Sequence, residues 1–191
     1  MSNASRKNHT ELWLILALCA APVVAAYVAF YWWQPQQGTM NYGELLPVKL
    51  LPDPDLQLMD GRAFHISELR RKWVLLQVDS GTCDKNCRHK LYILRQVRLT
   101  QGKDMQRIER AWVIDDNSAP SPQLLQEYSG TWVIRGTGSA LLKALPAPGS
   151  ARDHIYVVDP QGNLMLRFPP DADPRKMVKD ITRLLKVSRI G

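Results

Sequence analysis

The longest apolar stretch of the chain lies close to its N-terminus. Residues 12–33 (LWLILALCAAPVVAAYVAFYWW) contain no charged side chain. As a helix, this segment is about 33 Å long, which exceeds the hydrocarbon thickness of about 30 Å of a typical bilayer. Trp13 near one end and the aromatic residues 31–33 at the other are the side chains expected at the two membrane interfaces. The pattern predicts a transmembrane helix at 12–33 after a short N-terminus at 1–11.

Positive charge differs between the two sides of this segment. Arg6 and Lys7 precede it, while the first positive residue after it is Lys49. Because flanking positive residues stay in the cytoplasm, we expect residues 1–11 inside and the rest on the periplasmic or outer side of the inner (cytoplasmic) membrane, as a single-pass protein. A cleavable signal peptide is the alternative. The segment is longer than a signal core and ends in aromatics, which favours an uncleaved anchor.

The hydrophobic pattern changes twice after the apolar segment. Residues 34–52 are rich in Gln, Gly and Pro, have no clear periodicity and are predicted to be a tether. Residues 53–191 then alternate strand and helix signals. Strands are expected at 56–59, 63–66, 73–78, 108–114, 132–134, 154–158 and 164–168, and helices along 87–97, 122–128, 139–145 and from Asp173 onward.

Two elements carry especially clear signals. Residues 73–78 (WVLLQV) form a nearly continuous apolar run, as expected of a central strand buried on both faces. Near the C-terminus, Asp173 and Pro174 form a helix start, and apolar residues at spacings of three and four follow it. The alternation predicts an α/β domain with a mixed sheet flanked by helices.

Composition indicates one folded domain and gives it a basic surface. The chain is 45% hydrophobic and 23% charged, with a formal net charge of +7. Basic residues gather from Arg175 to the C-terminus and around the cysteines, at Lys85, Arg88, Lys90, Arg95 and Arg98. Because the topology places both groups outside the cytoplasm, we expect no nucleic acid. Anionic lipid head groups or an acidic protein are the expected partners, and a solvated basic face is the alternative.

The strongest chemical signal is a pair of cysteines. Cys83 and Cys87 (C-D-K-N-C) follow the predicted central strand directly, at the expected start of a helix. Residues at i and i+4 share one helix face, so the two thiols can bind a soft metal ion or close a disulfide. The helix N-terminus, Lys85 and Arg88 favour the thiolate form. A structural disulfide and simple packing are the alternatives, although so short a loop restrains the unfolded chain little.

The order of these features resembles the Sco/SenC family. The stretches that carry the likeness are FHISELRRKWVLLQVDSGTCDKNC at 64–87, DDNSAPSPQLLQEY at 115–128 and IYVVDPQG at 155–162. The resemblance implies a membrane-anchored, thioredoxin-like fold and a role in assembling the copper centre of cytochrome c oxidase. It also implies Cu(I) or Cu(II) at Cys83 and Cys87. The implied partner is the copper-bearing subunit of the oxidase or another assembly factor.

The chain departs from this family at the third metal ligand. The family's histidine lies five residues before the tyrosine of a late strand, and that offset falls on Ala151 here. His154, two residues before Tyr156, is the candidate replacement. Two thiolates suit Cu(I), whereas Cu(II) also prefers an imidazole nitrogen. The absence of the usual histidine therefore weakens the expected Cu(II) binding more than Cu(I) binding.

Three functions remain open from the sequence. The first is an oxidase assembly factor that binds Cu(I), or holds reducing equivalents, at Cys83 and Cys87. The second is a membrane-tethered thiol–disulfide oxidoreductase without copper, in which Cys83 attacks and Cys87 resolves. The third is a non-catalytic thioredoxin-fold module that binds a partner. Motifs for hydrolases and nucleotide binding, such as G-x-S-x-G and G-x-G-x-x-G, do not occur.

Overall fold

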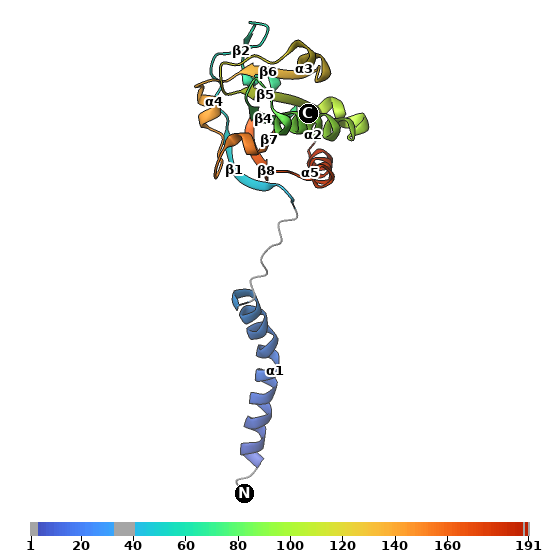
Figure 1. Ribbon diagram of the computed structural model, residues 1–191. Coiled ribbons are helices and arrows are strands. Elements are labelled where there is room, and N and C mark those ends of the chain that lie inside the picture. Colours follow the sequence, from blue (N-terminus) through green and yellow to red (C-terminus); the bar gives the residue numbers. More distant parts are fainter. Residues whose placement is uncertain (1–3, 33–40, 189, 191) are drawn as a thin grey trace. The chain divides into compact units, whose positions relative to one another are not determined.

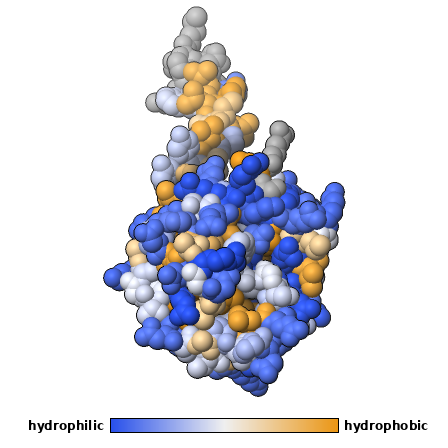
Figure 2. All heavy atoms as spheres, turned by 90° about the horizontal axis from the view of Figure 1, so that it is seen from above, coloured by the Kyte–Doolittle hydropathy of each residue, from blue (hydrophilic) through white to orange (hydrophobic). Residues whose placement is uncertain are grey.

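The computed structural model describes residues 4–32, 41–188 and 190, in two compact units. The first contains α1 (Ala4–Trp32), in which the 22 residues Thr10–Tyr31 are long and apolar enough to cross a bilayer. Hydrophobic residues cover much of this helix, whereas the second unit presents a mainly hydrophilic face (Figure 2). The prediction of one N-terminal apolar helix as a candidate transmembrane span is confirmed.

The second unit is built on one mixed sheet (Figure 1). In the described part of the chain, eight strands pair in the order β1-β8-β7-β4-β5-β6-β2-β3. β5 is parallel to both β4 and β6, and the other pairs are antiparallel. The strands are β1 (Glu44–Leu50), β2 (Leu56–Leu58), β3 (Ala63–Phe64), β4 (Trp73–Asp79), β5 (Ile108–Ile114), β6 (Thr131–Arg135), β7 (Ile155–Val158) and β8 (Asn163–Phe168).

Helical elements cover both faces of the sheet. On one face, Leu75 of β4 packs with Leu94 of α2 and Ile181 of α5. On the other, Leu76 of β4 packs with residues of η1 and α4. The α-helices of this unit are α2 (Lys85–Leu99), α3 (Pro122–Glu127), α4 (Ala140–Lys143) and α5 (Pro174–Val187), and the 3-10 helices are η1 (Ile66–Leu69), η2 (Gly102–Arg107) and η3 (Ala151–Asp153). The predicted mixed sheet flanked by helices is confirmed.

The central strand and the last helix form for the reasons the sequence indicated. All seven residues of β4 are buried, because helices cover the strand on both faces and strands pair with both of its edges. At the start of α5, the Asp173 side chain accepts a hydrogen bond from the Arg175 N–H at 2.8 Å, and Pro174 occupies the first turn. This cap fixes where the helix begins.

Part of the predicted tether belongs to the domain. Residues 33–40 lie outside the described residues, but Glu44–Leu50 form β1, antiparallel to β8 at one edge of the sheet. The Gly43 N–H also donates to the buried Asp180 carboxylate of α5 at 2.9 Å. The tether prediction was therefore wrong for this strand. An edge strand with exposed side chains has little periodicity, and its pairing with residues over 100 positions away leaves no local signal.

Leu75→Asp tests the assignment of β4 as the central strand. Leu75 is 0% exposed, so a carboxylate there has no solvent and no positive partner. We expect a loss of at least about 3 kcal/mol in the free energy of unfolding, measured by urea titration of the domain from Asn41 onward. Lys103→Asp, an equivalent change at an exposed position, should have little effect. Equal tolerance of the two changes would contradict the assignment.

Candidate functional site

The cysteine pair lies at the junction between β4 and α2. Cys83 and Cys87 form a disulfide, with their Cα atoms 5.1 Å apart. Asp84 caps α2, because its side chain accepts a hydrogen bond from the Cys87 N–H at 2.9 Å. Cys83 therefore precedes the helix, with a left-handed backbone at φ 45°. The expectation that both cysteines lie on the helix was wrong for Cys83, because Asp84 caps the helix and its first residue is Lys85.

The disulfide is enclosed by the domain. Cys83 is 2% exposed and Cys87 is 0% exposed. They pack in an apolar cluster whose other buried members are Leu91, Trp112, Ile114, Leu124 and Tyr128. Exchange with another thiol proceeds through attack on a sulfur atom, which requires access. The turn that carries Cys83 must therefore open before this pair can react with another molecule.

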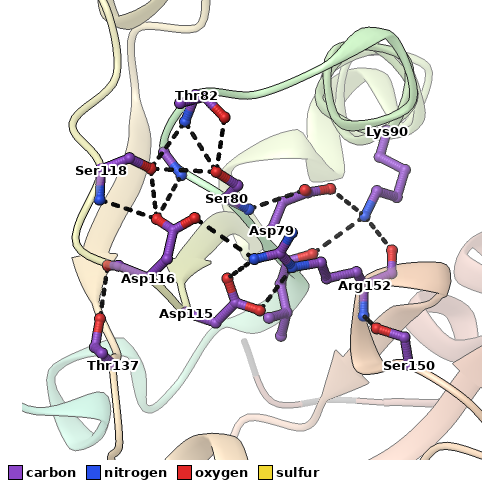
Figure 3. Close-up of polar contacts among 12 residues, drawn as sticks. Asp79, Ser80, Thr82, Lys90, Asp115, Asp116, Ser118, Thr137, Ser150 and Arg152 are labelled. Carbon is purple, nitrogen blue, oxygen red and sulfur yellow. Dashed lines mark hydrogen bonds and ion pairs between the residues drawn. The ribbon is translucent and has the colours of Figure 1, made fainter.

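A polar network fixes the turn in front of the disulfide (Figure 3). The Gly81 N–H donates to the Asp116 carboxylate at 3.2 Å, and the Thr82 N–H donates to the Ser118 hydroxyl at 3.1 Å. Ser118 in turn donates its own N–H and hydroxyl to Asp116. A Cβ atom at Gly81 would lie 2.2 Å from the Ser118 carbonyl oxygen. Only glycine fits this close approach between the two loops.

The pKa of Asp116 favours its role as the hydrogen-bond acceptor that holds the turn. Its partial burial raises the pKa, but the hydroxyls of Ser118 and Ser80 and the N–H of Gly81 donate to the carboxylate. These hydrogen bonds outweigh burial and hold the pKa of Asp116 well below its ordinary value of 3.8. Asp116 is therefore ionised at neutral pH and is an acceptor for the turn.

Two ion pairs lie beside the network (Figure 3). Lys90 Nζ lies 2.7 Å from the Asp79 carboxylate, and both side chains are about nine-tenths buried. Lys90 also donates to the Val78 carbonyl oxygen at 3.1 Å. Arg152 forms a two-point contact with Asp115, at 2.7 and 2.6 Å. These pairs join β4, α2, the end of β5 and η3.

The burial of Lys90 corrects the expectation that all the basic residues around the cysteines lie on the surface. Its charge is buried and paired with Asp79, whereas Lys85, Arg88 and Arg95 are exposed on α2. A sequence signal for this pair was present, since Lys90 follows Cys87 by three positions on the apolar side of the helix. Asp79 likewise ends an otherwise apolar strand.

The structure does not bring His154 to the cysteines. Its Nδ1 lies 2.9 Å from the Phe168 carbonyl oxygen, and its ring packs edge-on against Tyr156. Tyr156 pairs with Leu76 and packs with it, on the sheet face opposite the one on which Gln77 contacts Cys87. Among the described residues, no group of three or more His, Cys, Asp or Glu side chains is arranged to hold a metal ion.

With this geometry in hand, the fold and the cysteine pair define a thioredoxin-like protein. The family model of the transmembrane-like, thioredoxin-like C-terminal domain matches residues 73–188. The chain belongs to this family. Among curated proteins, none matches the chain in sequence.

Solved structures of Sco proteins share the fold. Copper-bound Sco1 from yeast aligns with a TM-score of 0.60 and 20% identity, over 73% of this chain and 94% of that one. Copper-bound ScoI from Bradyrhizobium japonicum aligns with a TM-score of 0.54 and 18% identity, over 71% and 99%. The thioredoxin domain of a thiol-disulfide oxidoreductase from Bacteroides vulgatus aligns with a TM-score of 0.54 and 15% identity, over 73% and 99%. The Sco-type fold implied by the sequence resemblance is confirmed.

Asp116→Asn tests the network that holds the turn. Because the folded pKa of Asp116 is lowered, its stabilising contribution is fully present above pH 3.8 and is lost as the pH falls toward the folded pKa. We expect the variant to be less stable than wild type by about 1 kcal/mol at pH 7, and by less at pH 3, in urea titrations.

Asp55→Asn is the matched control for this experiment. The Asp55 carboxylate is fully exposed and lies 3.5 Å from the His65 imidazole. Because an exposed pair of this kind contributes little, we expect its removal to leave the free energy of unfolding nearly unchanged at both pH values. A difference between wild type and Asp116→Asn that is the same at pH 7 and pH 3 would contradict the proposed charge dependence.

Proposed function

We propose that this chain is a membrane-anchored assembly factor of the Sco type, acting through Cys83 and Cys87 on the copper-bearing part of cytochrome c oxidase. The observation that carries the proposal is the position of the pair. The disulfide joins two cysteines that are separated by only three residues, at the junction of central strand β4 and helix α2, and so links residues that the fold already holds together. Such a short loop adds little stability by restraining the unfolded chain, which favours a chemical role.

The first part of the proposed chemistry is reversible exchange. A partner's dithiol reduces the Cys83–Cys87 disulfide, or the reduced pair reduces a partner's disulfide, and two electrons and two protons pass in either direction. Burial of both sulfurs means that the turn from Ser80 to Asp84 opens for each exchange. The hydrogen bonds from this turn to Asp116 and Ser118 then set how readily it opens.

The second part is the carriage of Cu(I) as cargo. In the reduced chain, the two sulfurs become soft thiolate ligands, which prefer Cu(I). Their Cα atoms are 5.1 Å apart, so both can reach one ion without a large change in the backbone. Among the described residues, no histidine, cysteine or carboxylate is grouped with the pair as a third ligand. This donor set fits Cu(I) and does not fit Cu(II), which also needs a nitrogen ligand.

A thiol–disulfide oxidoreductase without copper is the second candidate. The position of His154 favours it, because the imidazole contacts Phe168 and Tyr156 instead of the cysteines. The buried disulfide is as compatible with an oxidoreductase as it is with an assembly factor. Copper binding by the reduced pair separates the two candidates.

The proposed side of the membrane follows from the charges that flank the apolar span Thr10–Tyr31 of α1. Arg6 and Lys7 precede the span, and the first positive residue after it is Lys49. This asymmetry supports a cytoplasmic N-terminus and a domain on the periplasmic side. The proposed thiol chemistry suits that side, where disulfides form and persist.

A reporter fused after Gly191 tests this topology. We expect alkaline phosphatase to be active there, because that enzyme folds only outside the cytoplasm, and we expect a cytoplasmic reporter to be inactive. Replacing Arg6 and Lys7 by glutamate, and adding two lysines after position 34, should lower the phosphatase activity. An inactive phosphatase with an active cytoplasmic reporter on the original chain would overturn the proposed location.

Competition with a Cu(I) chelator tests the cargo. Full-length protein in detergent should carry Cys19→Ala, because Cys19 is a free and exposed cysteine on α1. After reduction, we expect about one Cu(I) per chain. Cys83→Ala or Cys87→Ala should lower the apparent affinity at least tenfold, since one thiolate alone loses the chelate.

His154→Gln is the matched control, and we expect it to bind Cu(I) like wild type because His154 contacts Phe168. A wild-type protein that fails to compete for Cu(I) but exchanges with glutathione would leave the oxidoreductase candidate in place. A pair that neither binds Cu(I) nor exchanges would contradict both and leave only a partner-binding module.

A further inference from the structure

The side chain next to the disulfide on β4 is a buried amide. Gln77 is 0% exposed in a strand whose other interior positions are apolar. It pairs with Trp112 of β5 on one side and Ile155 of β7 on the other, both of them buried. A polar group that is buried between two such side chains needs hydrogen-bond partners.

Among the residues that the structure describes, Gln77 has one weak partner when the disulfide is closed. Its Nε2 lies 3.7 Å from Cys87 Sγ, and its Oε1 has no hydrogen-bond partner in the described part of the chain. A disulfide sulfur is a poor acceptor and donates nothing, so it cannot pair with the Oε1 atom. The disulfide state therefore leaves a buried carbonyl unsatisfied, which is unfavourable.

Reduction changes what Cys87 offers to this amide. A Cys87 thiol can donate its hydrogen to Gln77 Oε1 after rotation of the amide group, and a Cys87 thiolate can accept a hydrogen bond from Nε2. Either form pairs with Gln77 better than the disulfide does. We propose that Gln77 is a positioning residue that shifts the equilibrium of the Cys83–Cys87 pair toward the reduced state.

This inference rests on the proposed function, since it assumes that the pair exchanges. In exchange with glutathione, two glutathione thiols are oxidised to one glutathione disulfide, and the Cys83–Cys87 bond breaks. Each protein sulfur ends with the proton of one glutathione thiol. Gln77 takes no part in the bond changes and acts only on the energies of the two end states.

The test is the exchange equilibrium of full-length Cys19→Ala protein in detergent with mixtures of reduced and oxidised glutathione, followed by alkylation and mass spectrometry. Gln77→Leu and Gln77→Met remove the amide while keeping a side chain of similar size. We expect both to shift the equilibrium constant about tenfold toward the disulfide, equivalent to a reduction potential about 30 mV more negative.

Leu75→Met is the matched control, on the same strand and the same face, and also 0% exposed. It should leave the equilibrium unchanged, because Leu75 packs in a different cluster from the cysteines. Circular dichroism of each oxidised variant checks the fold. If one Gln77 variant unfolds, the other still gives the equilibrium constant.

The outcomes separate the inference from the function. Gln77 variants that exchange with the wild-type equilibrium constant, or that shift toward the dithiol, would overturn the role of Gln77 and leave the proposed exchange intact. A shift as large in Leu75→Met would overturn it as well, since general packing would then account for the effect. A wild-type pair that does not exchange at all would overturn the proposed function itself.

Discussion

The geometry of the candidate site depends on the hydrogen bonds between two loops. Asp116 and Ser118, after β5, accept the N–H groups of Gly81 and Thr82, after β4. They hold the turn in which Cys83 adopts a left-handed backbone, and this conformation brings Cys83 to Cys87 in the first turn of α2. The position of one sulfur thus follows from a carboxylate in the loop after the neighbouring strand.

Buried charge reinforces the same region. The Asp79–Lys90 pair joins the end of β4 to α2, and removing either partner would leave an uncompensated charge about nine-tenths buried. The pair therefore fixes α2 against the sheet more than it adds net stability. A rigid strand and helix on either side of a short turn allow the turn to open locally while the rest of the fold persists.

Much of the fold was predictable from the sequence, because periodicity and capping are local. The run at β4 and the cap at Asp173 determined their elements directly. β1 was missed because its strand pairing is long-range, and the position of Cys83 was missed although Asp84, three residues before Cys87, is a helix-cap signal. The position of His154 could not be predicted, because it depends on which face of the sheet the residue occupies. His154 follows the short 3-10 helix η3, and no local sequence pattern specifies that face.

Reversible closure of the Cys83–Cys87 pair in the intact protein is the most direct test of the account. Full-length Cys19→Ala protein would be poised at a series of glutathione potentials, alkylated without denaturant, and its modified thiols counted by mass spectrometry. We predict two thiols per chain at reducing potentials and none at oxidising ones, with the same two-electron transition in both directions. A disulfide that resists reduction until the domain unfolds, or that fails to re-form, would contradict a redox role and mark the bridge as structural.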